Sequence, residues 1–277
     1  MSLDFTIVTA SYNYGHYIGE CLESVANQEG VTIEHLVFDG GSTDETAEVV
    51  GRFPHANFVQ EPDNGMCDAI NKGFRAAKGK WVMWLNSDDR LLPGALAAFK
   101  KFAEDHDDAD VIYGGWNFIN ADGSFRKRMT VFPHRPSLIL YVGCYIGTTS
   151  AFYRRETVID EGHHLNERFR YVMDGEFYAR LHSVGKKFIY YPRILADFRW
   201  HGENLSLRNH GKSTIDDWLT LQKQYAETRA IRRAYGRRWF RDDNFNGFVD
   251  ATLYVYWRAM KALLKRIYLF RLEKDQH

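Results

Sequence analysis

The first 115 residues alternate between short apolar runs and amphipathic segments. The apolar runs are rich in β-branched and aromatic residues, which favours buried strands. These predicted strands lie at residues 3–10, 31–38, 56–60, 80–85 and 111–113. Between them apolar positions recur at helical spacing, and the predicted helices lie at 16–27, from 43, at 70–79 and at 91–103. Strands that alternate with helices in this way predict βαβ units, an α/β fold and a mostly parallel central sheet.

The start of the second helix has its own signal. Ser42 and Glu45 have the spacing of a capping box, which predicts that this helix begins at Thr43.

The regular alternation ends near residue 115. Beyond it we expect mixed short strands and loops, a helix beginning at Asp174 or Gly175, and a helical pattern from 211 onward; the later short strands are predicted at 116–132, 143–154, 187–191 and 195–200. This organisation predicts one catalytic domain over 1–210, with a first half at 1–115 and a second half at 116–210. A C-terminal helical region would follow at 211–277.

Polar residues follow three of the predicted strands. They are the runs at 11–13 (Ser-Tyr-Asn), 39–41 (Asp-Gly-Gly) and 86–89 (Asn-Ser-Asp-Asp). In an open parallel sheet, ligands bind beyond the carboxyl ends of the strands. One polar strand end is ordinary loop chemistry, but three at the same edge predict a site.

The chemistry of that site is suggested by what its loops lack. Strand one is followed by S-Y-N-Y-G-H, so the G-x-G-x-x-G dinucleotide fingerprint is absent, and no G-x-x-x-x-G-K-[ST] loop occurs. A phosphate bound here would need another source of positive charge. The adjacent carboxylates of Asp88 and Asp89 can hold a hard cation whose shell a diphosphate completes. Alternatively, Ser87, Asp88 and Asp89 simply cap the next helix.

Charge is balanced overall but unevenly distributed. The chain has 36 Lys and Arg against 36 Asp and Glu, and residues 225–277 hold 12 of the former and 6 of the latter. Within this basic region, residues 253–272 carry apolar and aromatic positions at helical spacing. A basic amphipathic helix can lie on an anionic membrane surface, so we expect peripheral membrane contact through 229–272. The alternative is a helix packed on the catalytic domain with a solvated basic face.

Cysteine content and hydropathy bear on location. Cys21, Cys67 and Cys144 are too few and too scattered for a disulfide framework or a zinc site, which favours a reducing compartment. The first four residues lack the pattern of a signal peptide. No run of about 18 apolar residues exists to span a membrane. The expected location is cytoplasmic, with attachment to the inner face of the cell membrane if the basic region binds lipid.

A family resemblance emerges from four segments read in order. They are T-x-S-Y-N at 9–13, V-F-D-G-G-S-T-D-E-T at 37–46, E-P-D-N-G-M-C-D-A-I-N-K-G at 61–73 and W-L-N-S-D-D at 84–89. Together they resemble the family 2 glycosyltransferases with the GT-A fold. The resemblance extends to about residue 205 and is most specific over the first 95 residues.

The resemblance implies roles for residues that hold the donor base. Tyr12, with the backbone around Ala10 and Ser11, would flank the nucleobase. Asp39 would accept a hydrogen bond from a uracil N–H, although an Asp before Gly-Gly also suits a plain turn.

The resemblance also implies roles around the diphosphate. Asp68 and Lys72 would contact the donor, or else form a simple i, i+4 surface ion pair. Asp88 would touch the ribose. Asp89 would ligate a divalent metal, Mn²⁺ or Mg²⁺. The family's first acidic position is Ser87 in this chain, so no charge is expected from it.

The second half supplies the remaining roles. Asp174 matches the general base at a helix start, with a helix N-cap as the alternative and Glu176 as the reserve base. In the F-R-W-H-G-E-N-L-S segment, His201 would contact the metal or diphosphate and Arg199 would support the leaving group. The segment at 147–155 resembles the one under the acceptor, although its hydroxyls also suit an ordinary strand.

The function predicted from these residues is inverting, metal-dependent glycosyl transfer. The donor would be a nucleotide-diphosphate sugar, with UDP as the expected nucleotide, and the acceptor a glycan, expected to be lipid-linked, in cell-surface polysaccharide synthesis. No nucleic-acid partner is expected. The alternatives are a nucleotidyltransferase acting on sugar phosphates and a non-catalytic sugar- or nucleotide-binding protein. The first would carry a Gly-rich loop with a Lys or Arg, which residues 8–20 lack. The second would lack the metal carboxylate or the base.

Overall fold

A computed structural model describes residues 3–129, 131–141, 143–202, 204, 215–235, 259–260 and 262–263. Its contacts divide the chain into two compact units. Unit 1 comprises Met1–Met129, Ile146–Leu165 and Lys187–Arg199, and unit 2 comprises Thr130–Tyr145, Asn166–Lys186 and Trp200–His277. These units interleave along the sequence, so they do not coincide with halves separated at residue 115. The predicted domain boundaries remain predictions.

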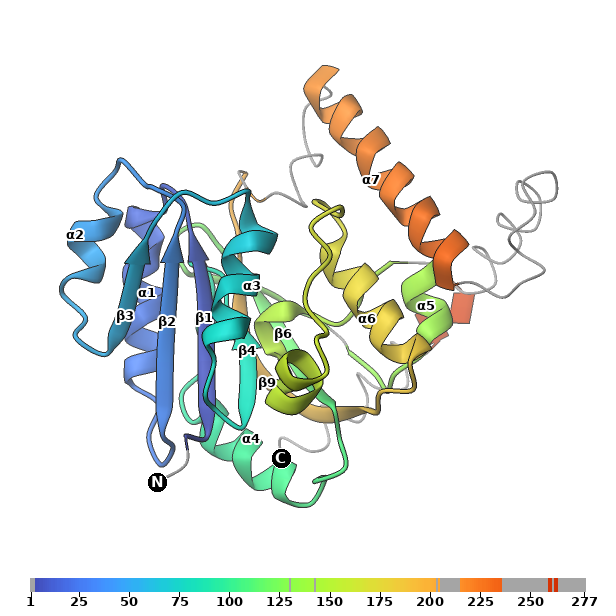
Figure 1. Ribbon diagram of the computed structural model, residues 1–277, viewed down its shortest axis with the longest axis horizontal. Helices are drawn as coiled ribbons and strands as arrows, with labels where there is room; N and C mark the ends of the chain where they lie inside the picture. The colour runs from blue at the N-terminus through green and yellow to red at the C-terminus, as the bar shows by residue number, and fades with distance from the viewer. Residues whose placement is uncertain are drawn as a thin grey trace. The chain divides into compact units, whose positions relative to one another are not determined.

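Unit 1 contains the sheet. Its strands are β1 (Phe5–Ser11), β2 (Ile33–Asp39), β3 (Ala56–Gln60), β4 (Trp81–Trp84), β5 (Arg90–Leu91), β6 (Val111–Asn120), β7 (Phe125–Met129), β8 (Ala151–Arg154) and β9 (Phe188–Trp200). The strand order is β3-β2-β1-β4-β8-β6-β9-β5, with β7 paired to β6. The strands from β3 to β4 run parallel, as Figure 1 shows. β8 is antiparallel to both β4 and β6. The predicted α/β architecture is therefore confirmed, with a mixed sheet that is parallel from β3 to β4 and has antiparallel pairs beyond β4.

Helices connect the strands of unit 1 and form much of unit 2. They are α1 (Gly15–Ala26), α2 (Thr46–Val50), α3 (Met66–Ala76), α4 (Ala95–Glu104), α5 (Pro136–Tyr141), α6 (Met173–Ser183) and α7 (Ile215–Tyr235), with a 3₁₀ turn at Thr148–Ser150 and a π-helical turn at Glu156–Asp160. In unit 2, α5, α6 and α7 contact one another.

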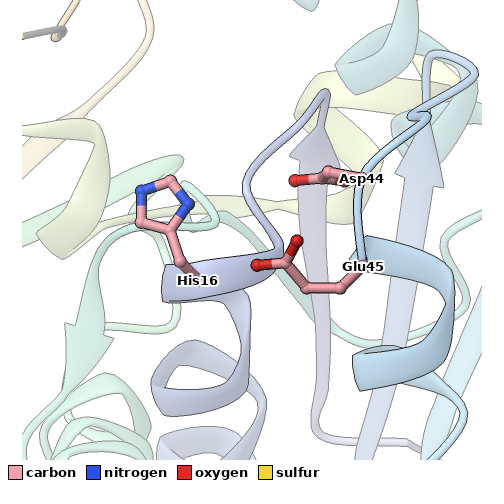
Figure 2. A group of neighbouring side chains, drawn as sticks. All are labelled: His16, Asp44 and Glu45. Carbon is pink, nitrogen blue, oxygen red and sulfur yellow. The ribbon is translucent and has the colours of Figure 1, made fainter.

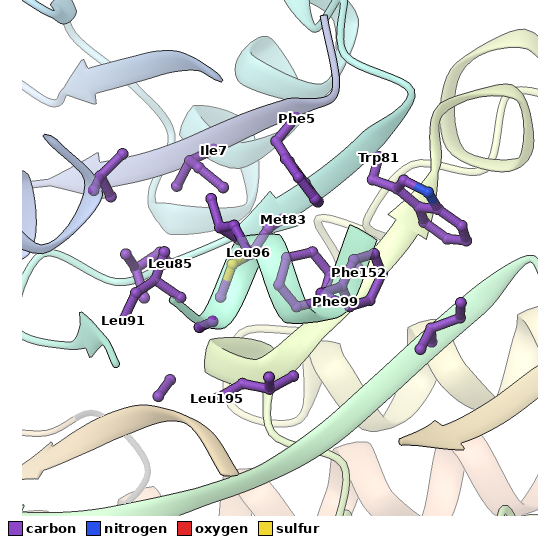
Figure 3. Packing of buried hydrophobic residues seen from close by; sticks show 14 of the residues in the cluster. Phe5, Ile7, Trp81, Met83, Leu85, Leu91, Leu96, Phe99, Phe152 and Leu195 are labelled. Carbon is purple, nitrogen blue, oxygen red and sulfur yellow. The ribbon is translucent and has the colours of Figure 1, made fainter. Parts of the chain in front are cut away.

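The core of unit 1 lies between the sheet and α4. Figure 3 shows Phe5 of β1, Phe99 of α4 and Phe152 of β8 packed together. The ring centroids of Phe99 and Phe152 are 3.9 Å apart, and those of Phe5 and Phe99 are 5.7 Å apart in an edge-to-face arrangement. All three rings are fully buried. Burial of such a side chain stabilises the fold by about 1.5–3 kcal/mol, which fixes the strands whose ends form the site.

The opposite face of β1 packs closely against α3. A Cβ atom added at Gly73 would lie 2.2 Å from Val8 Cγ1. Only glycine therefore lets the helix approach the strand this closely, and this approach places the start of α3 beside the carboxyl edge of the sheet.

The predicted start of the second helix is wrong by three residues, because α2 begins at Thr46. Ser42 does not cap this helix, because its hydroxyl donates to Asp39 Oδ2 at 2.5 Å. The N-cap position is Glu45, and the Thr46 backbone N–H at the start of the helix donates to Asp44 Oδ1 at 3.1 Å. The bond between Asp44 and Thr46 replaces the expected capping box, because the Ser42 hydroxyl already donates to Asp39.

Two later predictions also need correction. Residue 91 begins no helix, because Arg90–Leu91 pairs with β9 as a short strand and α4 begins at Ala95. The two strands expected at 187–191 and 195–200 are one continuous strand, β9, interrupted by neither Pro192 nor Arg193. Pairing with partners distant in sequence decided both outcomes.

The predicted amphipathic helix at 253–272 lies outside the described residues, except that 259–260 and 262–263 are helical. Among the helices that are described, none combines the length and apolarity needed to cross a bilayer.

Candidate active site

The polar strand ends of unit 1 meet at one edge of the sheet, as the sequence predicts. Ser11 at the end of β1 pairs in register with Asp39 at the end of β2. Leu85, which leads into the Asp88–Asp89 pair, donates its backbone N–H to the Val8 carbonyl at 3.0 Å and so extends β4 alongside β1. Three loops therefore leave the sheet side by side.

The loop after β1 presents an aromatic ring. Tyr12 is 62% exposed, whereas Ser11 before it is buried. Asn13 adopts a φ of 56° and ties this loop to the next one. Its backbone N–H donates to Ser42 Oγ at 2.7 Å, and its Oδ1 accepts from Thr43 N at 2.9 Å. The exposed ring at a fixed strand end is suited to stacking on a planar base.

Asp39 is buried and surrounded by donors. Its Oδ1 accepts from the backbone N–H groups of Gly41 at 3.1 Å and Ser42 at 2.7 Å, and from Gln60 Nε2 at 3.0 Å. Its Oδ2 accepts from Ser42 Oγ. The carboxylate therefore organises the turn after β2. The base contact that the resemblance implies would use the acceptor capacity that remains on Oδ2.

Asp68 and Lys72 lie on α3 and face each other. Lys72 Nζ is 3.6 Å from Asp68 Oδ2 and 2.9 Å from Glu61 Oε1. Asp68 Oδ2 also accepts from the Asn64 backbone N–H at 3.1 Å. The hydrogen bond to Glu61 holds the pKa of Lys72 above its usual value, so the side chain carries a firm positive charge. The ion pair expected as the simple alternative is present, and a donor contact by either residue remains a prediction.

Asp88 and Asp89 follow β4 and are both buried. Asp89 Oδ1 accepts from the Arg199 backbone N–H at 2.9 Å. Its Oδ2 accepts from Asn86 Nδ2 at 2.9 Å and from the Thr149 hydroxyl. Burial, together with the negative charge of Asp88, raises the pKa of Asp89 well above its usual value. A bound cation would offset the negative charge that these two adjacent buried residues bring together.

This arrangement fits a divalent metal by the chemistry of its donors. Carboxylate oxygens are the ligands that Mg²⁺ and Mn²⁺ prefer. A carboxylate offers about four lone-pair positions, and three of those on Asp89 are used by protein donors. Asp89 can therefore supply one further ligand position to a metal, and Asp88 can supply another. The assignment of Asp89 as a metal ligand stays a proposal.

A second cluster of possible metal ligands consists of His16, Asp44 and Glu45, close to the loop that follows β1. Figure 2 shows His16 at the start of α1 turned toward Asp44 and Glu45 at the start of α2, and their ligand atoms all lie within 4.8 Å of one another. Asp44 Oδ2 already accepts from the Gly15 backbone N–H at 2.9 Å, and its Oδ1 accepts from Thr46. His16 and Glu45 are exposed. The contacts of Asp44 explain this cluster as a junction between two helix starts.

In unit 2, the predicted base lies in the first turn of α6. Asp174 is half-buried, and its Oδ1 accepts from the Gly175 backbone N–H at 2.8 Å. Burial raises the pKa of Asp174, and a hydrogen bond from the Cys144 thiol works in the opposite direction. A base with a raised pKa is better matched to proton abstraction near neutral pH.

The reserve base has a different environment. Glu176 is fully buried, its Oε1 lies 2.9 Å from Arg180 Nε, and the same oxygen accepts from the Tyr235 hydroxyl at 2.7 Å. These contacts join α6 to α7 within unit 2, which favours a structural role for Glu176 and leaves Asp174 as the candidate.

The start of α6 has an anchor that the sequence did not reveal. Glu227 of α7 accepts the backbone N–H groups of Arg170 at 3.0 Å, Tyr171 at 2.9 Å and Val172 at 3.1 Å. A carboxylate at a helix start is favourable because the N–H groups there have no partner within the helix. No local sequence signal links Glu227 to residues more than 50 positions away.

His201 and Asn204 form a buried pair in unit 2. Asn204 Oδ1 accepts the His201 backbone N–H at 2.8 Å, and Asn204 Nδ2 is 3.2 Å from His201 Nε2. The asparagine orients the imidazole ring. The expected metal or diphosphate contact of His201 remains a prediction.

Arg199, expected at the leaving group, is fully buried in unit 1. Its Nε donates to the Asp88 carbonyl at 2.9 Å, its Nη1 to the Ala121 carbonyl at 2.8 Å and its Nη2 to Glu20 Oε2 at 2.6 Å. Every guanidinium nitrogen thus donates to a protein acceptor beside the Asp88–Asp89 pair. No local sequence signal pointed to Glu20, because it lies in a helix 179 residues away.

The segment at 147–155, expected under the acceptor, contributes to the same pair. Thr149 is fully buried and donates to Asp89, and Ser150 Oγ donates to the Gly114 carbonyl at 3.0 Å. Both hydroxyls therefore have protein partners within unit 1.

Unit 1 thus combines a run of parallel strands with two adjacent buried acidic residues, Asp88 and Asp89, beyond the end of β4. A family profile described as "Glycosyl transferase family 2" matches residues 6–162, more than half of the chain. The chain therefore belongs to glycosyl transferase family 2, and its fold is of the GT-A type.

Curated relatives align over different parts of the chain. Chondroitin synthase from Pasteurella multocida is 27% identical over 256 residues, which is 91% of this chain and 25% of that protein. A PGL/p-HBAD biosynthesis glycosyltransferase from Mycobacterium bovis is 34% identical over 116 residues, which is 40% of this chain and 45% of that protein. The chain thus spans a quarter to a half of these relatives.

Solved structures share the fold at low identity. Residues 1–349 of S. aureus TarS in complex with UDP-GlcNAc match with a TM-score of 0.64 and 19% identity, covering 92% of this chain and 79% of that one. The mannosyltransferase PcManGT from Pyrobaculum calidifontis, in complex with GDP-Man and Mn²⁺, matches with a TM-score of 0.57 and 17% identity, covering 99% and 87% of the two chains.

Proposed function

We propose that this protein is an inverting, metal-dependent glycosyltransferase that uses a nucleotide-diphosphate sugar. The observation that carries the proposal is the buried Asp88–Asp89 pair at the end of β4, held by Asn86, Thr149 and Arg199. Membership of glycosyl transferase family 2 favours glycosyl transfer over nucleotidyl transfer and over a non-catalytic role.

The donor-binding roles divide among the strand ends of unit 1. The exposed ring of Tyr12, with Ala10 and Ser11, stacks on the base, and Asp39 accepts from it. Asp88 holds the ribose or the metal, and Asp89 holds the metal. Asp68 and Lys72 contact the donor from α3. A uracil N–H suits the acceptor at Asp39, so UDP-sugars are the donors to test first.

A divalent metal, Mn²⁺ or Mg²⁺, with Asp89 as its proposed ligand in unit 1, would offset negative charge on the departing nucleotide diphosphate. The contact of His201 with the metal or the diphosphate stays a prediction from the family resemblance. Asp174 takes the proton from the acceptor hydroxyl. The acceptor oxygen then forms its bond to the anomeric carbon as the bond between that carbon and the diphosphate oxygen breaks, which inverts the configuration. Burial of Asp174 supports this role, because it raises the pKa of that carboxyl toward the working range.

The proposed acceptor is a glycan on a lipid carrier at the inner face of the membrane. The support is the basic region, and α7 exposes Arg229 and Arg233. Full-length protein with both residues changed to Glu should co-sediment less with vesicles of phosphatidylglycerol and phosphatidylcholine than the wild type. Equal co-sedimentation would remove the membrane proposal. Exposed Lys101 of α4, changed to Glu, controls for loss of charge alone.

The donor proposal is tested by calorimetric titration of UDP, GDP and their sugars with and without Mn²⁺. We expect one nucleotide class to bind the wild type only when Mn²⁺ is present. Asp89→Ala should lose this Mn²⁺-dependent binding. Asp105→Ala, at an exposed position after α4, is the matched control. Mn²⁺-dependent binding of undiminished affinity by Asp89→Ala would contradict the proposed metal site.

A further inference from the structure

Arg199 is a buried cation with every guanidinium nitrogen engaged by protein. Its three donors reach the carbonyls of Asp88 and Ala121 and the carboxylate of Glu20. The guanidinium also lies 5.0 Å over the ring of Tyr17. A buried charge is costly unless it is paired and hydrogen-bonded, and Arg199 is paired with Glu20 and donates from each of its three guanidinium nitrogens.

The same residue grips both members of the carboxylate pair. The side chain of Arg199 holds the backbone of Asp88, and the backbone N–H of Arg199 holds the carboxylate of Asp89 at 2.9 Å. The guanidinium is a planar, rigid fork. A shift of Arg199 would therefore move the backbone of Asp88 and the carboxylate of Asp89 together.

Glu20 sets the position of that fork from α1. Its Oε2 accepts from Arg199 Nη2 at 2.6 Å and from Arg90 Nη1 at 3.0 Å. Arg90 directly follows Asp89 in the chain, and its Nε pairs with Asp197 Oδ2 at 2.8 Å. The Glu20 carboxylate thus contacts both arginines, and Asp197 supplies a second negative charge to Arg90.

The turn between β6 and β7 supplies backbone acceptors to both arginines. Ala121 accepts from Arg199 and Gly123 accepts from Arg90 Nη2 at 3.1 Å, both through backbone carbonyls. A Cβ added at Gly123 would lie 3.2 Å from Arg90 Nη1, and the residue has a φ of 81°. Glycine is therefore favoured where the turn meets the arginine.

We propose that Arg199 and Glu20 are positioning residues that hold Asp88 and Asp89 in the geometry for a metal and a nucleotide diphosphate, so that Arg199 acts through these carboxylates and not by touching the leaving group. The inference rests on the proposed function. It adds Glu20, Arg90 and the β6–β7 turn to the machinery of the site. Groups that orient metal ligands typically change metal affinity by about 10- to 100-fold when they are removed.

The test measures Mn²⁺ dependence, which a merely structural role would not move. Full-length Glu20→Ala, Glu20→Asp and Arg199→Lys are compared with the wild type by calorimetric titration of UDP at a series of Mn²⁺ concentrations, well below each variant's melting temperature. We expect Glu20→Ala and Arg199→Lys to need about 10- to 100-fold more Mn²⁺ for half-maximal UDP affinity. Excess Mn²⁺ should restore much of the UDP affinity. The Mn²⁺ requirement of Glu20→Asp should lie between those of the wild type and Glu20→Ala. Arg52→Gln, which breaks an exposed ion pair with Glu48 on α2, should match the wild type.

The possible outcomes distinguish failure of the proposed function from failure of the positioning role of Arg199 and Glu20. Wild-type protein that binds neither UDP nor GDP with Mn²⁺ would contradict the proposed function and this inference with it. Wild-type binding with an unchanged Mn²⁺ requirement in Glu20→Ala would overturn this inference alone. Loss of UDP affinity in Arg199→Lys that no Mn²⁺ concentration restores, beside a normal Glu20→Ala, would instead place Arg199 on the diphosphate. If Arg199→Lys does not fold, the Glu20 variants decide the matter. Glu20 is 45% exposed, and Glu20→Asp keeps a carboxylate for the buried guanidinium where Glu20→Ala removes it.

Discussion

The hydroxyl of Thr149 donates a hydrogen bond to the carboxylate of Asp89, and both side chains are buried. The two residues are 60 positions apart and belong to the 3₁₀ turn before β8 and the loop after β4. Because β8 is inserted antiparallel beside β4, the turn that precedes β8 arrives at the edge where β4 ends. A segment expected under the acceptor therefore supports the acidic pair.

We predict that Thr149→Val destabilises the protein and weakens Mn²⁺-dependent nucleotide binding. Valine keeps the shape but leaves Asp89 without one of its three donors. Loss of a hydrogen bond to a buried charged group costs about 1–3 kcal/mol. Urea unfolding measures the stability and calorimetry the binding. Thr148→Val, at the half-buried neighbouring position, should change neither, and a Thr149→Val protein as stable as wild type would show that the bond contributes little.

We predict that Asp174→Asn keeps Mn²⁺-dependent donor binding and loses transfer, because asparagine keeps the shape of the side chain but cannot take a proton. The expected fall in kcat is about 10²- to 10⁴-fold, the usual contribution of general base catalysis. Transfer of sugar to an acceptor and donor titration are measured on the same protein. Transfer at a near wild-type rate would refute the base assignment.

The pH dependence of transfer should carry the signature of the same carboxyl. Since burial raises the pKa of Asp174, the rate should be lost as pH falls through a value above the ordinary 3.8. The Cys144 thiol opposes this rise, so Cys144→Ala should raise the pKa further and move the acidic limb of kcat/KM to higher pH. Cys144→Ser keeps a donor and should leave the limb near its wild-type position. An unmoved limb in the alanine variant would exclude the thiol contact.

We predict that Glu227→Ala lowers kcat more than it lowers donor affinity. The carboxylate holds three backbone N–H groups immediately before α6, whose first turn carries Asp174. Without it the start of that helix loses its anchor. Glu227→Gln retains an acceptor oxygen, so its kcat should lie between those of the wild type and Glu227→Ala. Lys223→Ala, at an exposed position on the same helix, is the control. Equal losses in kcat and in donor affinity would argue against a specific effect on the base.

We predict that acid destabilises the protein partly through His35. Burial, and then the neighbouring His55, lower the pKa of His35 from 6.5 to about 3. Between these values the unfolded chain binds a proton that the folded protein does not, so stability is present above about pH 6.5 and falls as the pH drops toward 3. Replacement by Gln should reduce the slope of unfolding free energy against pH by up to about 1.4 kcal/mol per unit. An unchanged slope in His35→Gln would contradict the assignment.

Local pattern was sufficient for the first half of the sheet. The β-branched runs that became β1, β2 and β4 were recognisable because each strand is buried on both faces between helices. It was insufficient for β5, whose two residues are a strand only through pairing with β9, and for the start of α2, where Asp39 engages the serine that would have capped it. In both places a partner far along the chain, or a competing acceptor, overrode the local preference.

The amino-acid sequence by itself determined that Ser11, Asp39 and the Asp88–Asp89 pair would share one edge, since parallel strands joined by helices all end on the same side. Only the tertiary structure decided which atoms hold those carboxylates: Thr149 and Arg199 for Asp89, and Glu20 behind Arg199. The physical reason is range. Hydrophobic periodicity is written within ten or twenty residues, whereas a hydrogen bond forms between whichever groups packing brings within about 3 Å, however far apart they are in the chain.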